Sequence, residues 1–82
     1  MTRKEILAAI GEIAREHLGQ EGPLAQDTRL VEDLGLDSIR LLTLAAEVEN
    51  RFRIVIEPEQ EAGLATVGDL VRLVADRIGV DG

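Results

Sequence analysis

The chain has 82 residues, a length that allows one small domain with a thin hydrophobic core. Its net charge of −7 argues against nucleic-acid binding, and the absence of cysteine excludes a disulfide framework, a thiolate metal site and a native thiol nucleophile. With no stretch typical of a signal peptide or a membrane span, we expect a soluble cytoplasmic protein that neither binds nucleic acid nor inserts into a membrane.

The first expected helix covers residues 3–18. Thr2 and Glu5 have the spacing of a capping box, in which each side chain bonds the backbone N–H of the other residue. Apolar residues then recur at helical spacing, and Gly19 is a suitable residue to end the helix. The chain has one aromatic residue, Phe52, so the core must be built from Leu, Ile, Val and Ala. Such a core suits helices packed on helices.

A long loop is expected between this helix and the next. The stretch from residue 19 to residue 37 contains two early glycines, one proline and no sustained periodicity, with room for one turn around residues 30–34. Its apolar residues are expected to anchor it to the core, and these are Leu24, Leu30, Val31 and Leu34.

The second helix is expected from Ser38 to Arg51 or Phe52, with Asp37 as its N-cap. At 100° per residue, one apolar arc faces the core and contains Leu41, Leu44, Ala45, Val48 and Phe52. A second apolar stripe, elsewhere on the helix, contains Ile39, Leu42 and Ala46. This stripe either packs beneath the loop or is offered to a partner, and the sequence leaves both possibilities open.

Two further helices complete the expected fold. Pro58, with acidic residues before and after it, favours a short helical turn over a strand, because a lone strand would have no partner. Thr66 and Asp69 predict the start of the last helix and Gly79 its end, and its buried face is expected to contain Val67, Leu70, Val71, Val74 and Ile78. The prediction is an all-α fold: a small four-helix bundle of three longer helices and one short helix, with a long first loop, in a single domain of residues 1–82.

Ser38 stands at the junction of loop and helix, where most serines only cap the helix. Asp37 already fills that role, so the Ser38 hydroxyl is free at the positive end of a helix dipole, a position that suits a phosphate. A catalytic serine would need a base and a group to orient it. The only histidine, His17, lies late in the first helix, and the Gly-x-Ser-x-Gly elbow is absent. We therefore expect no enzymatic activity and no catalytic or metal-binding residue.

Four features of the sequence carry a resemblance to a known family: the motif "DLGLDSI" after a long loop, a helix ending in "VENRF", the following "I-x-P", and a capped helix that begins with "TVGDLV". Through these features the chain resembles the acyl carrier protein family over about Ile6–Ile78. The resemblance implies that Ser38 bears a 4′-phosphopantetheine arm, installed from coenzyme A by a phosphopantetheinyl transferase. The thiol of the arm would then carry acyl groups as thioesters between biosynthetic enzymes. The resemblance also implies that Asp37 assists recognition by the transferase, besides capping the helix.

The resemblance further implies a partner-binding surface, made of Ile39, Arg40, Leu42, Ala46 and Glu57. The expected partners are the transferase, an acyl- or aminoacyl-loading enzyme, and synthase or condensation enzymes, with the carrier itself a monomer. The residue at position 40 fits the aryl and aminoacyl carriers of nonribosomal peptide assembly, whereas "VENRFRIVIEP" fits stand-alone acyl carriers, so a fatty-acid, polyketide or peptide pathway is open. The alternative function is an unmodified, acidic helical interaction module.

Overall fold

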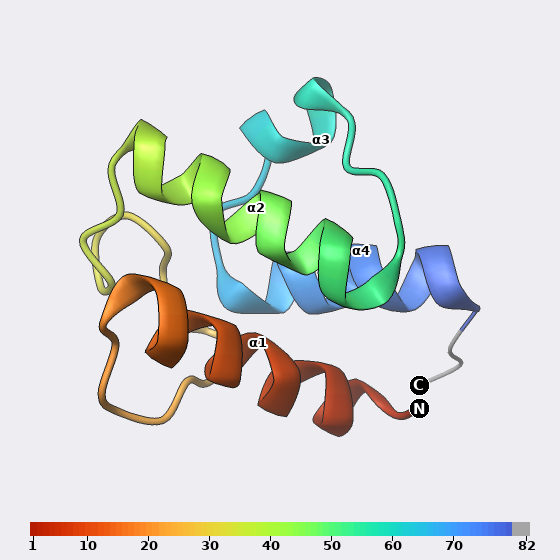
Figure 1. Ribbon diagram of the computed structural model, residues 1–82, viewed down its shortest axis with the longest axis horizontal. Coiled ribbons are helices and arrows are strands. Elements are labelled where there is room, and N and C mark those ends of the chain that lie inside the picture. The colour runs from red at the N-terminus through yellow and green to blue at the C-terminus, as the bar shows by residue number, and fades with distance from the viewer. Residues whose placement is uncertain (80–82) are drawn as a thin grey trace.

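Four α-helices are seen in the computed structural model, which describes residues 1–79 (Figure 1). They are α1 (Arg3–Leu18), α2 (Ser38–Phe52), α3 (Pro58–Ala62) and α4 (Val67–Ile78). Within residues 1–79 the only β-type pairing is an isolated bridge between Arg29 and Thr66, so the all-α prediction is confirmed. None of these helices combines the length and the apolar character needed to cross a bilayer. The single domain over residues 1–82 stays a prediction, and residues 80–82 lie outside the described residues.

Side-chain caps set the starts of the helices. Thr2 Oγ1 accepts from the Glu5 amide at 3.2 Å, and Glu5 Oε1 accepts from the Thr2 amide at 2.7 Å. Thr66 and Asp69 form the same reciprocal pair at the start of α4, with both distances at 3.1 Å. Left-handed backbone ends three helices, at Gly19, Arg53 and Gly79. The predicted bounds of the three longer helices are confirmed. They could be predicted because the caps that fix them act within one helical turn.

The core is aliphatic and centres on α1, which packs against both α2 and α4. Burial of one such side chain contributes about 1.5–3 kcal/mol, so this cluster supplies most of the stabilisation of the fold. The largest fully buried side chains are Ile6, Ile10, Leu30, Leu44, Val48, Val67, Leu70, Val71 and Val74.

Several side chains expected in the core are less buried than predicted, and Leu24, Leu34 and Leu41 are only half-buried against it. Val31 is 54% exposed and Ile78 is 36% exposed, while Phe52 is only half-buried. Phe52 and Ile78 are the last residues of α2 and α4, and Phe52 still packs against the core cluster. Val31 lies in the turn that follows the fully buried Leu30, where its carbonyl oxygen accepts from the Gly35 amide at 2.9 Å.

The long loop is joined to the start of α4 by its backbone. Three hydrogen bonds make this connection: Leu30 N–H to Ala65 O at 3.0 Å, Val67 N–H to Thr28 O at 2.9 Å, and Gly68 N–H to Gln26 O at 2.8 Å. The approach at residue 68 is so close that a Cβ there would lie 2.8 Å from Gln26 O, which requires a glycine. The loop is therefore part of the packed structure.

Polar contacts hold α3 in place, since this helix has no buried residue. The Arg77 guanidinium, in the last turn of α4, donates to the carbonyl oxygen of Val55 and to Oε1 of Gln60. The Glu49 carboxylate of α2 accepts from the Ile56 amide at 2.8 Å. The connection between α2 and α3 is thus fixed from both neighbouring helices.

Candidate functional site

Ser38 is the first residue of α2, is exposed, and is the only serine in the chain. Asp37 caps the helix as predicted, because its Oδ1 accepts from the Arg40 amide at 2.8 Å. The first backbone hydrogen bond of the helix runs from Leu41 N–H to Asp37 O at 2.9 Å. The capping role is therefore filled by Asp37, and the Ser38 hydroxyl faces solvent without a hydrogen-bond partner in the described structure.

The segment that leads into Ser38 is anchored on the core. Leu30 is fully buried and Leu36 is 4% exposed, and the Leu36 amide donates to Leu30 O at 3.2 Å. Between them Gly35 has φ +67°, a left-handed conformation that glycine adopts without strain. Two buried leucines therefore fix the backbone just before the exposed serine, so the hydroxyl is displayed from a rigid support.

Leu36 was not among the core residues expected from the sequence, although it is 4% exposed. A signal for its burial was present. Leu36 directly precedes the N-cap Asp37, and Leu41 is the fourth residue of the helix, which is the spacing of a hydrophobic staple. Both side chains belong to the packed apolar cluster. This pattern could have predicted that the entry to α2 is anchored.

Two acidic side chains of the loop are partly neutralised by one arginine. The Arg29 guanidinium lies 3.2 Å from Oδ1 of Asp33 and 3.8 Å from Oε2 of Glu32. The Arg29 backbone amide also donates to Asp33 Oδ2 at 2.8 Å. These hydrogen bonds from Arg29 lower the pKa of the Asp33 carboxyl below its usual value. The loop before Ser38 therefore presents less free negative charge than its sequence suggests.

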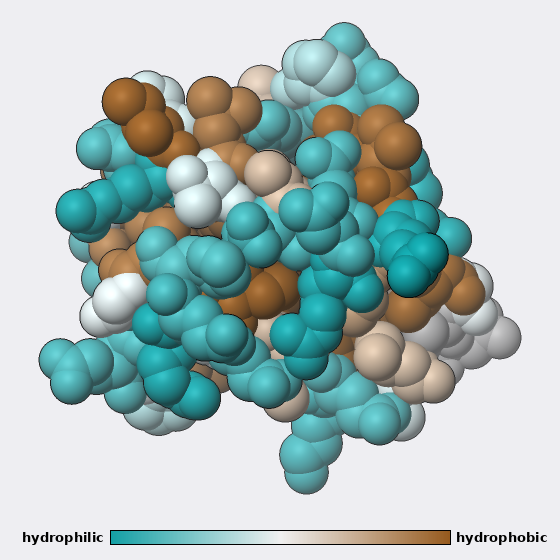
Figure 2. Space-filling model, in the orientation of Figure 1, coloured by the Kyte–Doolittle hydropathy of each residue, from teal (hydrophilic) through white to brown (hydrophobic). Residues whose placement is uncertain are grey.

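The second apolar stripe of α2 faces solvent. Ile39 is 73% exposed, Leu42 is 55% exposed and Ala46 is exposed, so the possibility that the stripe packs beneath the loop is wrong. Figure 2 shows apolar surface beside the first turn of α2, at the upper left of the view. Exposed apolar side chains gathered on one helix indicate an interaction site.

Both carboxylates of α2 are engaged within the protein. Glu49 accepts from the Ile56 amide, and Oε1 of Glu47 lies 3.4 Å from Nε2 of His17 on α1. Arg40, in the first turn, is exposed and takes part in no ion pair among residues 1–79. The solvent face of α2 near Ser38 is therefore apolar with one cation.

Two residues named from the sequence lie outside α2. Glu57 is exposed at the start of α3, where its amide donates to Gln60 Oε1 at 3.0 Å. His17 contacts Glu47, which is nine residues along α2 from Ser38, about 13 Å at the helical rise. No serine–histidine pair is formed, and no group of His, Asp and Glu within residues 1–79 is arranged to hold a metal ion.

The start of α2 is suited to a phosphate group. The amides of Ser38 and Ile39 precede the first backbone hydrogen bond of the helix, so their N–H groups are free for an external acceptor. The helix dipole adds a partial positive charge at the same place. A phosphate joined to the Ser38 oxygen would meet these donors, so the residues present fit a phosphate-linked group.

Comparison with known proteins gives four further findings. Residues 5–74 match the family described as "Phosphopantetheine attachment site". The acyl carrier protein of Exiguobacterium sibiricum is 35% identical over 79 residues, covering 95% of this chain and 100% of that protein. The meromycolate extension acyl carrier protein of Mycobacterium tuberculosis is 36% identical over 75 residues, covering 90% and 65%. The crystal structure of an acyl carrier protein from Thermotoga maritima superposes with a TM-score of 0.87 at 31% identity, covering 96% of this chain and 93% of that one.

Proposed function

Because the chain belongs to the acyl carrier protein family, whose members carry a 4′-phosphopantetheine arm, we propose that Ser38 is the residue that bears the arm. The observation that supports this proposal is the exposed hydroxyl of the only serine at the start of α2, beside two free amides. When bound, the arm supplies a thiol that holds acyl groups as thioesters. The protein is a non-catalytic carrier, which a phosphopantetheinyl transferase modifies and synthase enzymes use.

The attachment is a phosphoryl transfer to the Ser38 oxygen. A bond forms between Ser38 Oγ and a pyrophosphate phosphorus of coenzyme A, while the bond from that phosphorus to the adenosine bisphosphate leaving group breaks. The hydroxyl proton passes to a base of the transferase. This chain contributes the fixed position of the oxygen, and Asp37 keeps the first turn of α2 ordered through its bond to the Arg40 amide.

The experiment that tests this assignment measures the mass of the intact protein. After incubation with coenzyme A and a broad-specificity transferase, the protein should gain the mass of one phosphopantetheine group, and Ser38→Ala should gain none. Thr43→Ala is the matched control, because this hydroxyl lies on the same helix and donates to Ile39 O at 3.1 Å. A gain that persists in Ser38→Ala, or no gain in the natural chain with several transferases, would favour the unmodified interaction module.

We also propose that partner enzymes dock on Ile39, Leu42 and Ala46 with Arg40 beside them. Support comes from the exposure of the three apolar side chains and from the engagement of both α2 carboxylates elsewhere. The complementary surface is then apolar and carries a carboxylate opposite Arg40, because charge complementarity selects partners and speeds their encounter. If α2 instead exposed free carboxylates, the complementary surface of a partner enzyme would be basic.

The cargo that we propose is an acyl chain of a fatty-acid or polyketide type of pathway. The support is that the relatives named above are acyl carriers, one of them for meromycolate extension. The test starts from the phosphopantetheinylated protein and compares loading by an acyltransferase with loading by an amino-acid-activating enzyme, each read as a mass change. Leu42→Arg should slow loading, whereas Val55→Arg, which is equally exposed but lies beyond α2, should not.

A further inference from the structure

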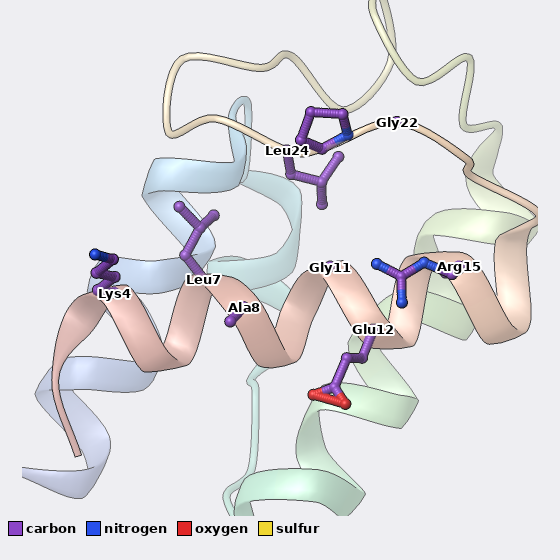
Figure 3. Close-up of a pocket in the computed structure, with 9 residues that line it drawn as sticks. Lys4, Leu7, Ala8, Gly11, Glu12, Arg15, Gly22 and Leu24 are labelled. Atoms are coloured by element: carbon purple, nitrogen blue, oxygen red, sulfur yellow. The ribbon is translucent and has the colours of Figure 1, made fainter.

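A groove lies between α1 and the early part of the long loop, and none of the residues that line it belongs to α2 (Figure 3). Its volume is about 420 Å³. Its walls come from Leu7 and Leu24, which are half-buried against the core, and from Pro23 of the loop. Its floor is the helix surface at Ala8 and Gly11. The groove is thus apolar along its length and separate from Ser38.

The glycine in the floor is not required by the fold. Gly11 lies within α1, where glycine is less stable than alanine by about 0.5–1 kcal/mol. Its φ is not in the left-handed region, and a Cβ added there would meet no atom within 4 Å. Neither backbone conformation nor packing therefore explains the glycine. Its absent side chain instead leaves the middle of the groove open.

The charge in the groove has the opposite sign to that of the whole chain. Three charged side chains line it, and the only acid among them, Glu12, has its Oε1 3.0 Å from the guanidinium of Arg51 on α2. Figure 3 shows the Glu12 carboxylate pointing away from the loop. Lys4 and Arg15 form no ion pair within residues 1–79. Two free cations therefore flank an apolar groove on a protein of net charge −7.

The separation of the two cations restricts the ligand. Lys4 and Arg15 are eleven residues apart on one helix, which places their backbones about 16 Å apart. An extended peptide covers that length in about five residues. A single-chain amphiphile with one anionic head would satisfy only one of the two cations.

We propose that this groove binds an extended acidic peptide segment of a partner protein, with apolar side chains lying over Ala8 and Gly11 and carboxylates at both ends facing Lys4 and Arg15. The affinity comes from apolar burial in the middle, and the charges at the ends set position and selectivity. Because the groove contains neither Ser38 nor any residue of α2, such a segment can stay bound while the carrier end of the molecule engages an enzyme.

The probe is a synthetic heptapeptide with two glutamates at each end and leucine, valine and leucine between them. It is titrated into the ¹⁵N-labelled full-length chain, and backbone amide chemical shifts are followed by NMR. We expect the shifts to concentrate at residues 4–15, 22 and 24, since Pro23 has no backbone amide hydrogen. A peptide with lysines in place of the glutamates should not bind, and dodecanoate tests the single-chain amphiphile.

Two variants locate the site. Gly11→Leu places a side chain into the open groove and should weaken peptide binding by about tenfold or more, which corresponds to about 1.4 kcal/mol. Arg15→Glu should weaken it comparably, whereas Arg72→Glu, an exposed residue of α4 outside the groove, is the control for net charge. Gly11→Leu should still accept phosphopantetheine in the mass assay. A failure of peptide binding therefore contradicts only the groove proposal, and a failure of phosphopantetheine attachment contradicts only the Ser38 proposal.

Several outcomes would overturn the proposal. The first is that no amide shift changes at the highest peptide concentration, and the second is that the changes are confined to α2. The third is that Gly11→Leu binds the peptide as tightly as the natural chain does and has an unchanged melting temperature. The last is that dodecanoate binds in the groove and the peptide does not. The last outcome would assign the groove to a lipid-like anion instead.

Discussion

The amide of Gly68 donates a hydrogen bond to the carbonyl oxygen of Gln26 at 2.8 Å, and a Cβ on residue 68 would stand at the same 2.8 Å from that oxygen. Gly68→Ala therefore forces the loop away from α4. We expect a loss of about 1–3 kcal/mol in the free energy of unfolding, measured by denaturant titration. Gly11→Ala is the matched control, because its Cβ has free space, and it should stabilise by about 0.5–1 kcal/mol. Equal effects of the two substitutions would contradict the close contact.

Neighbouring residues of the long loop allow a direct test of its role in the core. Leu30 is fully buried, whereas Val31 is 54% exposed. Leu30→Ala should lower the free energy of unfolding by about 2–5 kcal/mol, because it removes buried methyl groups and leaves a cavity. Val31→Ala should change it by less than about 0.5 kcal/mol. Thermal or urea unfolding of both variants measures the difference, and a mild effect at Leu30 would show that the loop contributes little to the core.

The cap of α2 has a measurable effect on stability. Asp37→Ala removes the acceptor for the Arg40 amide, and we expect a loss of about 0.5–2 kcal/mol. Asp37→Asn keeps an oxygen acceptor and should recover most of that loss. The same two variants separate the capping role of Asp37 from its role in recognition by the transferase. If the rate of phosphopantetheine attachment falls in Asp37→Asn while the free energy of unfolding does not, the transferase recognises the negative charge of Asp37.

One carboxylate gives a defined dependence of stability on pH. Hydrogen bonds from the Ala65 and Thr66 amides to Asp69 lower the pKa of its carboxyl below the ordinary value of 3.8. A lowered folded-state pKa means that the stabilisation is present at pH values well above 3.8 and is lost as the pH falls through 3.8 and then through the lower folded value. Asp69→Asn should therefore flatten the acid limb of a plot of unfolding free energy against pH. An unchanged acid limb would contradict the assignment.

The sequence predicts most of the fold because the helix bounds are set locally. The pairs Thr2–Glu5 and Thr66–Asp69, and the glycines at 19 and 79, act within one helical turn, so a single sequence contains what is needed to place them. The capping of α2 by Asp37 and the exposure of Ser38 follow from the same local chemistry. These are the features on which the expected arm attachment depends.

The remaining features depend on contacts between segments far apart in the chain. Arg77 contacts Val55, 22 residues away, and Gln60, 17 residues away, and no local pattern encodes these pairings. The same applies to the solvent exposure of Ile39 and Leu42 and to the groove beside α1, because both depend on where the loop lies. The engagement of the α2 carboxylates, which leaves its outer face apolar, could likewise be seen only in the structure.

The purely polar attachment of α3 has a kinetic consequence. Since no side chain of α3 is buried, releasing it requires breaking the contacts of Arg77 and Gln60 but exposes little apolar area. Its amide protons should therefore exchange with deuterium through frequent local opening, whereas those in the middle of α1 should exchange only when the whole molecule unfolds. The protein would then fluctuate most between α2 and α4 while its central helix stays closed.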